Sequence, residues 1–187
     1  MYEFELKKGR PDSLDGRLPK EIRCYELLDR LGAEYYHVDH IDTPADTMQA
    51  CEEVDGALGC MICKNLFLCN RQKTEFYMLV MPARKPFKTK DLSAQINSAR
   101  LSFADSEFML KFLDITPGSV SVLGLMNDTE NRVKLLVDED VLKDEYFGCH
   151  PCINTTSLKV KTDDIFDKFI NEVHHPKTVV RLPWYEM

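Results

Sequence analysis

The chain has 187 residues, of which 44% are hydrophobic and 29% are charged. This length suits one domain with its own core, and the composition excludes a disordered or fibrous protein. The formal net charge of −7 opposes non-specific attraction to nucleic acid, so a nucleic-acid partner would need a local patch of Lys and Arg.

The first 18 residues are polar and charged, and we expect an N-terminal leader over residues 1–18 before a domain over residues 19–187. The leader lacks the continuous apolar segment of a signal peptide, so we expect a cytoplasmic protein. No apolar run approaches the roughly 18 residues of a membrane span, so we expect no membrane partner. Seven cysteines are an odd number for a disulfide framework, and we expect mostly free thiols.

The N-terminal third predicts two helices separated by a strand. Residues 19–31 have apolar side chains at helical spacing, a proline in the first turn and a glycine just past the end. Residues 34–40 are β-rich and predict a short strand. The stretch Thr43-Pro44-Ala45-Asp46 resembles a capping box, which predicts a second helix over residues 44–53 that ends near Gly56.

After residue 58 the helical spacing of apolar residues gives way to β-prone runs. Residues 59–69 and 75–81 are apolar, β-prone runs joined by a polar turn, which predicts a hairpin. The elements expected after it are helices over residues 89–101 and 106–113, an ordered loop over 115–125, strands over 132–138, 156–160 and 178–182, and a last helix over 162–173.

Helices and strands alternate irregularly in this pattern, and at least one pair of strands forms a hairpin. The sequence therefore predicts an α+β fold: a single domain with a mixed, largely antiparallel sheet flanked by helices. Neither Gly-rich phosphate-binding motif, G-x-G-x-x-G or G-x-x-x-x-G-K-[ST], is present. Nucleotide binding by these common loops is not supported.

Two Cys-x-x-Cys pairs, Cys60 with Cys63 and Cys149 with Cys152, raise the possibility of a zinc or redox site. The first pair lies in an apolar, strand-like run, where residues three apart point to opposite faces of a sheet. The second pair is not followed by the helix that usually accompanies a redox dithiol. We favour small, buried cysteines, and a four-cysteine zinc or thiol-redox protein remains the alternative.

Lys64 and Asn65 stand inside the apolar strand run "CKNLFLC". An unpaired ammonium is costly to bury, so a lysine here needs an explanation. One explanation is a lysine on an edge strand, where the charge opposes aggregation. The other is a cation that projects into a pocket and holds a phosphate or stabilises a developing oxyanion.

Three further segments carry polar or basic groups with a structural and a functional interpretation. The "TPGSVS" stretch, residues 116–121, suits either a surface turn or a close backbone approach to a ligand. The "HPCINTT" stretch, residues 150–156, offers a histidine and several hydrogen-bonding side chains. A basic stretch is either a solvated loop or a phosphate-facing patch, and its cations are Arg84, Lys85, Lys88 and Lys90. We expect His174 and His175 to be the frayed end of the last helix.

Four segments taken in order resemble the YbaK/ProX family of aminoacyl-tRNA deacylases. They are residues 63–82, 101–128, 133–142 and 150–170, and the likeness extends from about residue 19 to residue 182. More narrowly, they resemble the ProX branch, which comprises freestanding relatives of the editing domain of prolyl-tRNA synthetases. The resemblance implies a mixed, curved sheet packed by helices around a small pocket. It also implies hydrolysis of the ester that joins a wrong amino acid, typically alanine, to the 3′ end of tRNA for proline.

The resemblance implies site residues by matching position. The lysine of the Lys-Asn-Leu-Phe-Leu signature is expected in the pocket with its neighbour, and the others lie in the Gly-Ser loop and the His-Pro-x-x-Asn segment. The expected catalytic residues are Lys64, Asn65 and His150, and the expected substrate-binding residues are Gly118, Ser119, Asn154 and Thr155. An aminoacyl ester is already activated, and the neighbouring ribose hydroxyl can assist, so the reaction needs neither a cofactor nor a metal.

Two departures from the family pattern bear on which amino acid is removed. Val122 and Leu123 stand where the family often has Pro and Phe, and Thr155-Thr156-Ser157 replaces an Ala-Thr-Thr-like run. Both changes lie near the expected pocket, so they affect its expected size more than its chemistry. A non-catalytic member that binds tRNA or an amino acid as a sensor remains a second alternative.

Overall fold

The computed structural model describes residues 4–41 and 48–185 of the 187. Its α-helices are α1 (Pro19–Arg30), α2 (Met48–Leu58), α3 (Thr89–Gln95), α4 (Ser106–Leu113) and α5 (Ile170–Glu172). Its strands are β1 (Lys7–Lys8), β2 (Tyr35–Asp39), β3 (Met61–Asn70), β4 (Phe76–Pro82), β5 (Leu101–Phe103), β6 (Val133–Asp138), β7 (Tyr146–Cys149), β8 (Thr156–Lys161) and β9 (Lys177–Val180). Short 3-10 helices, η1 (Val122–Asn127) and η2 (Val141–Lys143), and a π-helical stretch, η3 (Asp164–Phe169), complete the described elements.

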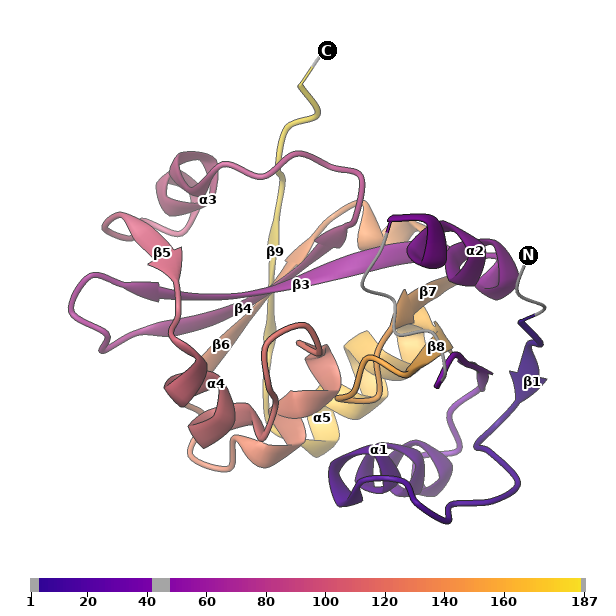
Figure 1. The fold of residues 1–187 in the computed structure, drawn as a ribbon. Helices are drawn as coiled ribbons and strands as arrows, with labels where there is room; N and C mark the ends of the chain where they lie inside the picture. Colours follow the sequence, from indigo (N-terminus) through magenta and orange to yellow (C-terminus); the bar gives the residue numbers. More distant parts are fainter. Residues whose placement is uncertain (1–3, 42–47, 186–187) are drawn as a thin grey trace.

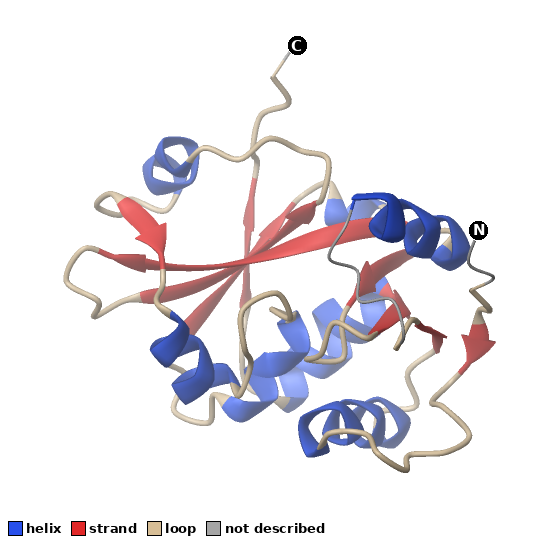
Figure 2. Cartoon of the chain, in the orientation of Figure 1, coloured by secondary structure: helices blue, strands red, loops and turns tan. Residues whose placement is uncertain are grey.

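The strands of the described residues form one mixed sheet in the order β1-β2-β8-β7-β3-β4-β6-β9, and β5 pairs with the end of β3 away from β7. Pairing is antiparallel except for β3 with β7, β4 with β6 and β6 with β9. Figure 2 shows the strands in the middle of the molecule with helices around them. The predicted α+β fold with a mixed, largely antiparallel sheet is confirmed.

The β3–β4 hairpin is the long central element, and it matches the predicted hairpin closely. Its strands pair in register from Cys63 with Pro82 to Cys69 with Phe76. Figure 1 shows α3 on one side of this hairpin and α4 and α5 on the other. Side chains alternate along a strand, so β3 sends Phe67 into the core shared with α4 and α5, and Leu68 into the smaller core under α3.

The helices after the leader begin and end for local reasons. Helix α1 starts with a proline in its first turn and is followed by Gly32 in the left-handed region, as predicted. The second helix ends two residues beyond the predicted end near Gly56. Helix α2 continues to Leu58 and is followed by Gly59 at φ +61°, the conformation that a helix C-terminus favours. The expected capping box at residues 43–46 lies outside the described residues.

Several predicted elements are confirmed and several short ones were missed. Helix α4 has the predicted bounds, and β6, β8 and β9 lie within two residues of the predicted strands. The predicted helix over 89–101 is half wrong, because α3 ends at Gln95 and β5 follows. The expected loop over 115–125 includes the start of η1, and β7 was not predicted.

The predicted leader contributes to the sheet. Strand β1 pairs antiparallel with β2, and the backbone N–H of Gly9 donates to the carbonyl of Tyr35 at 2.8 Å. The division of the chain at residue 18 stays a prediction. In the described parts of the chain, no helix is both long and apolar enough to cross a membrane.

Candidate functional site

A cavity of about 390 Å³ lies where β3, the loop after β7 and the loop before η1 meet the C-terminal half of α2. Four of the predicted site residues line it together: Lys64, Asn65, Gly118 and His150. These residues come from positions up to 86 apart in the sequence, between Lys64 and His150. The fold therefore brings residues of three separate sequence motifs to one cavity.

Lys64 is held by the hairpin and by the loop that follows it. Its side chain is partly buried, and its Nζ donates a hydrogen bond to the backbone carbonyl of Lys85 at 2.6 Å. Burial lowers the pKa of Lys64 from its ordinary value. An ammonium has three donors, so the bond to the carbonyl leaves two hydrogens for a ligand.

Lys85 overturns part of the predicted basic patch. Its side chain is buried, and its Nζ lies 2.9 Å from both carboxylate oxygens of Asp138 and 2.9 Å from Asp140 Oδ2. Trp184 also donates from Nε1 to that Asp140 oxygen at 2.8 Å. The prediction that Lys85 faces solvent or a phosphate is therefore wrong. Lys85 neutralises two acids at the end of β6, and so fixes the backbone that carries the partner of Lys64.

Asn65 joins the hairpin to the start of η1. Its Oδ1 accepts a hydrogen bond from the backbone N–H of Val122 at 3.1 Å. This side chain thus anchors the end of the loop whose glycine, Gly118, lies in the left-handed region at φ +87°. A Cβ at Gly118 would lie 3.9 Å from Nδ2 of Asn154, so these two predicted residues are neighbours.

His150 has one ring nitrogen fixed by the backbone. Its Nδ1 lies 3.1 Å from the carbonyl of Thr156, and because a carbonyl only accepts, Nδ1 carries the hydrogen. In the neutral ring Nε2 is then an acceptor. Burial lowers the pKa of His150, and the bond to Thr156 offsets only part of that effect. Burial therefore favours the neutral form of the ring.

The backbone partner of His150 is itself anchored by an ionic network that the sequence did not predict. The hydroxyl of Thr156 donates to Asp39 Oδ1 at 2.7 Å, and Arg17 binds the other oxygen of Asp39 at 2.7 Å. Arg17 also donates to Glu21 Oε1 at 2.6 Å, which in turn accepts from the hydroxyl of Tyr25 at 2.7 Å. Burial alone would raise the pKa of Asp39, but its bonds to Arg17 and Thr156 outweigh burial and lower it.

Three predicted substrate-binding residues, Ser119, Asn154 and Thr155, are not among the described residues that line the cavity. Ser119 is buried, and its backbone N–H donates to the carbonyl of Thr116 at 3.2 Å. Thr155 is half-buried, and its carbonyl accepts from the backbone N–H of His40 at 2.9 Å. Val122 and Leu123, which depart from the family pattern, are fully buried in the main core.

The thiols lie near the site without forming a cluster that suits a metal. Cys63 and Cys149 line the cavity, and burial raises the pKa of both thiols. The sulfurs of Cys24 and Cys152 lie 3.6 Å apart. No group of three or more His, Cys, Asp or Glu in residues 4–41 and 48–185 is placed to hold a metal ion. The two Cys-x-x-Cys pairs thus do not converge on one tetrahedral centre.

The expectation for His174 and His175 is wrong for one of the two. His174 is exposed at the end of α5, as a frayed terminus would be. His175 is buried, and its Nε2 lies 2.9 Å from Asp128 Oδ2. This pair ties the chain before β9 to the end of η1 and lies apart from the cavity residues.

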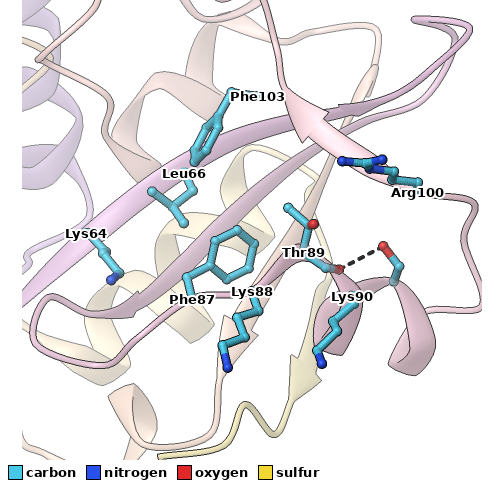
Figure 3. Close-up of a pocket in the computed structure, with 9 residues that line it drawn as sticks. Lys64, Leu66, Phe87, Lys88, Thr89, Lys90, Arg100 and Phe103 are labelled. Carbon is cyan, nitrogen blue, oxygen red and sulfur yellow. Dashed lines mark hydrogen bonds between the residues drawn. The ribbon is translucent and has the colours of Figure 1, made fainter. Parts of the chain in front are cut away.

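A second cavity, of about 910 Å³, adjoins the first at Lys64, which lines both. Figure 3 shows Lys64 at one end of this second cavity and Arg100 at the other, with Leu66, Phe87 and Phe103 between them. Two further cations, Lys88 and Lys90, also line it. Of the predicted basic patch, these two lysines face this cavity, whereas Arg84 lines a different hollow beside α2.

Comparisons with known proteins point to one family. The family described as "Aminoacyl-tRNA editing domain" matches residues 42–168 of the chain. "Prolyl-tRNA editing protein ProX" of Acetoanaerobium sticklandii is 29% identical over 138 residues, covering 74% of this chain and 83% of that protein. "Prolyl-tRNA synthetase associated domain-containing protein 1" of Danio rerio is 26% identical over 167 residues, covering 87% of this chain and 86% of that protein.

A solved structure shares the fold. The crystal structure of a candidate trans-editing enzyme for prolyl tRNA synthetase superposes with a TM-score of 0.65. It is 13% identical in sequence, and the match covers 89% of this chain and 99% of the other. At that identity the likeness establishes the shared fold alone.

Proposed function

The chain belongs to the aminoacyl-tRNA editing domain family, and we propose that it hydrolyses the ester joining a wrong amino acid to the 3′ end of a tRNA. We propose Ala-tRNA for proline as the substrate. The names of the relatives, which refer to prolyl-tRNA editing and to prolyl-tRNA synthetase, support this choice of tRNA. The resemblance of the chain to the ProX branch supports alanine.

One observation carries the proposal. A partly buried ammonium and an imidazole whose pKa is lowered by burial line the same small cavity as a left-handed glycine, at Lys64, His150 and Gly118. Each of the two polar side chains is oriented by a backbone carbonyl and keeps free hydrogen-bonding capacity. A hydrogen-bond donor or a cation placed where negative charge develops stabilises the transition state of ester hydrolysis.

In the proposed reaction a water oxygen adds to the ester carbonyl carbon, and the carbonyl oxygen gains negative charge. Lys64 stabilises that charge with the hydrogens not used by Lys85. The bond from the carbonyl carbon to the ribose oxygen then breaks, and the proton lost by water passes to that oxygen. His150 Nε2 accepts a hydrogen bond and orients the water or the neighbouring ribose hydroxyl. The products are the free amino acid and the tRNA.

Selection against the correct amino acid is proposed to depend on size. Small side chains, including Cys63 and Cys149, line the cavity, and its volume is about 390 Å³ in total. A pocket that admits alanine and clashes with the proline ring discriminates more strongly than the roughly 1–3 kcal/mol that one missing methylene gives. This step would act after the synthetase as a second, smaller sieve.

The test is a panel of mischarged tRNAs. Tritiated Ala-, Ser- and Cys-tRNA for proline, together with Pro-tRNA, are incubated with trace wild-type protein and with Lys64→Ala. We expect Ala-tRNA to be hydrolysed fastest and Lys64→Ala to lower kcat/KM at least about 100-fold, the loss typical of one oxyanion donor. Lys134→Ala, an exposed strand lysine that lines neither cavity, is the control for charge and folding.

Three outcomes of this panel would contradict parts of the proposal. Equal rates for Lys64→Ala and wild type would contradict the role of Lys64. Hydrolysis of Pro-tRNA at a rate comparable to Ala-tRNA would overturn the size sieve. Tight tRNA binding without turnover of any ester would identify a sensor in place of an enzyme.

A further inference from the structure

The second cavity that Lys64 lines has a chemistry unlike the first. Its lining includes four cations, Lys64, Lys88, Lys90 and Arg100, and no acidic side chain within the described part of the chain. The whole protein carries a net charge of −7, so a groove with cations alone is a strong local exception. Such a groove attracts a polyanion although the surface as a whole repels one.

The charges of this groove are not used up by internal ion pairs. Lys88, Lys90 and Arg100 are exposed, and among the described residues none of them takes part in an ion pair. Lys88 Nζ lies 3.5 Å from the centre of the Tyr185 ring, and the hydroxyl of Tyr185 donates to the nearby carboxylate of Asp91. These cations contrast with Lys85, whose charge is neutralised inside the protein.

Aromatic side chains lie between the cations. Phe103 on β5 is 62% exposed, which is unusual for a large apolar side chain. Phe87 is half-buried against the core under α3. Figure 3 places both rings near Leu66, between the ammonium of Lys64 and the guanidinium of Arg100. Cations for a phosphate backbone with aromatic faces for bases are the two components of a single-stranded nucleic-acid site.

We propose that this groove binds the single-stranded 3′ end of the substrate tRNA, with phosphates at Lys88, Lys90 and Arg100 and a base against Phe103. Lys64 lines both cavities, so a bound ester at Lys64 would have its amino acid in the smaller cavity and its nucleotides in the groove. The inference rests on the proposed function for the identity of the RNA. It adds which residues bind the nucleotides and on which side of Lys64 they lie.

The first experiment measures binding without catalysis. Fluorescence anisotropy of uncharged tRNA labelled at its 5′ end gives Kd for wild type, for Lys88→Ala/Lys90→Ala/Arg100→Ala and for Phe103→Ala. We expect the triple variant to raise Kd at least 30-fold. Its plot of log K against log salt should be shallower by about 2, since each single-strand phosphate contact contributes about 0.7. Phe103→Ala should raise Kd about 5- to 30-fold with an unchanged salt slope.

The control variant removes three cations elsewhere, Lys20→Ala/Lys111→Ala/Arg132→Ala, none of which lines either cavity. It carries the same change in net charge, and we expect its Kd to stay within about 3-fold of wild type. Thermal unfolding of all variants verifies that the substitutions leave the fold intact. If the groove variant and this control lose equal affinity, or if neither loses any, the proposed groove is wrong.

The second experiment separates the groove from the chemistry. Deacylation of Ala-tRNA is compared with that of alanyl-adenosine, which carries the ester without the upstream nucleotides. The groove variant should lose at least 10-fold in kcat/KM on Ala-tRNA, through KM, and keep its rate on alanyl-adenosine. Equal loss on both substrates would overturn the assignment of nucleotides to the groove. If wild type hydrolyses no ester but its tRNA binding still depends on the groove, the proposed function fails and the groove stands.

Discussion

Lys64 and His150 line the same cavity, but different kinds of structure hold them in place. Lys64 lies in the long β3–β4 hairpin, whereas His150 follows the four-residue strand β7. Each side chain binds a backbone carbonyl, and each carbonyl belongs to a residue whose own side chain enters an ionic network. The two networks, around Lys85 and around Arg17, differ in burial and composition. That difference predicts how each half of the site responds to substitution.

The Lys85 network is the more deeply buried one. The side chains of Lys85 and Asp138 are 2% and 0% exposed, and Asp140 is 18% exposed. Lys85→Met keeps the length of the side chain and leaves two acids without their shared cation. We expect the variant to lose about 3–5 kcal/mol of unfolding free energy, the usual result of removing one partner from a buried pair. Urea denaturation followed by circular dichroism measures the loss.

Two further variants define the cause of that loss. Lys143→Met removes the exposed cation that binds the same Asp140, and we expect at most about 1 kcal/mol, as for surface pairs. Lys85→Met/Asp138→Leu removes both buried charges and should recover part of the stability. If Lys85→Met costs no more than Lys143→Met, the buried network does not stabilise this half of the site.

The Arg17 network should give a smaller effect. Arg17 is 10% exposed and Glu21 2%, but Asp39 is 35% exposed and keeps the hydroxyl of Thr156. We expect Arg17→Met to cost about 2–3 kcal/mol, because water can solvate one of the two carboxylates left behind. Arg23→Met breaks an exposed ion pair with Asp114 and is the matched control, expected within about 1 kcal/mol. Equal losses for Arg17→Met and Lys85→Met would remove the distinction between the networks.

Thr156 connects the Arg17 network to His150, and its substitution tests that connection. Thr156→Val removes the hydroxyl that donates to Asp39 at 2.7 Å but keeps the carbonyl that binds His150. We expect a loss of about 1 kcal/mol in stability. We also expect a several-fold fall in kcat/KM, because the backbone beneath His150 becomes less constrained. Thr178→Val, at an exposed position of β9, is the control. It should change the unfolding free energy by no more than about 0.5 kcal/mol and leave kcat/KM unchanged.

The sequence predicted the Lys64 half of the site better than the His150 half, and the reason is local. The hairpin consists of two long apolar, β-prone runs, the ten residues of β3 and the seven of β4, so no distant contact is needed to identify it. In the His150 half, strand β7 has four residues. A segment this short carries almost no periodicity, and its pairing with β3 and β8 decides its conformation.

The burial of charged and titratable side chains was predicted least well. From the sequence alone such a side chain is expected to be exposed, because its ion-pair partner is not known. Lys85 stands among other cations in the sequence, and only the return of β6 brings Asp138 to it. His175 depends in the same way on Asp128, which is 47 positions away. Asp138 and Asp140 directly after an apolar strand were a usable signal, because acids at a strand end beside a core require a cation or solvent.

The smallest expected effect is a pH dependence that distinguishes His150 from Lys64. Catalysis as proposed uses the neutral ring of His150, because protonation removes the acceptor at Nε2. Burial lowers the pKa of His150, so kcat/KM should stay level as pH falls from 7.5 and decline only below about 6.5, the ordinary value for histidine. The unfolding free energy should likewise fall as pH drops below about 6.5, because the folded state disfavours the charged form of the His150 ring. This contribution is complete above pH 6.5 and is lost as pH falls through the lowered pKa.

The measurement is kcat/KM between pH 5 and 7.5 for wild type, His150→Ala and the control His174→Ala, whose side chain is exposed. The decline on the acid side should persist in His174→Ala and disappear in His150→Ala, leaving a lower and flatter profile. A wild-type midpoint at or above pH 6.5 would mean that His150 is not held neutral by its surroundings. In that case Lys64 would be the one side chain of the two assigned to catalysis whose charge the surroundings perturb.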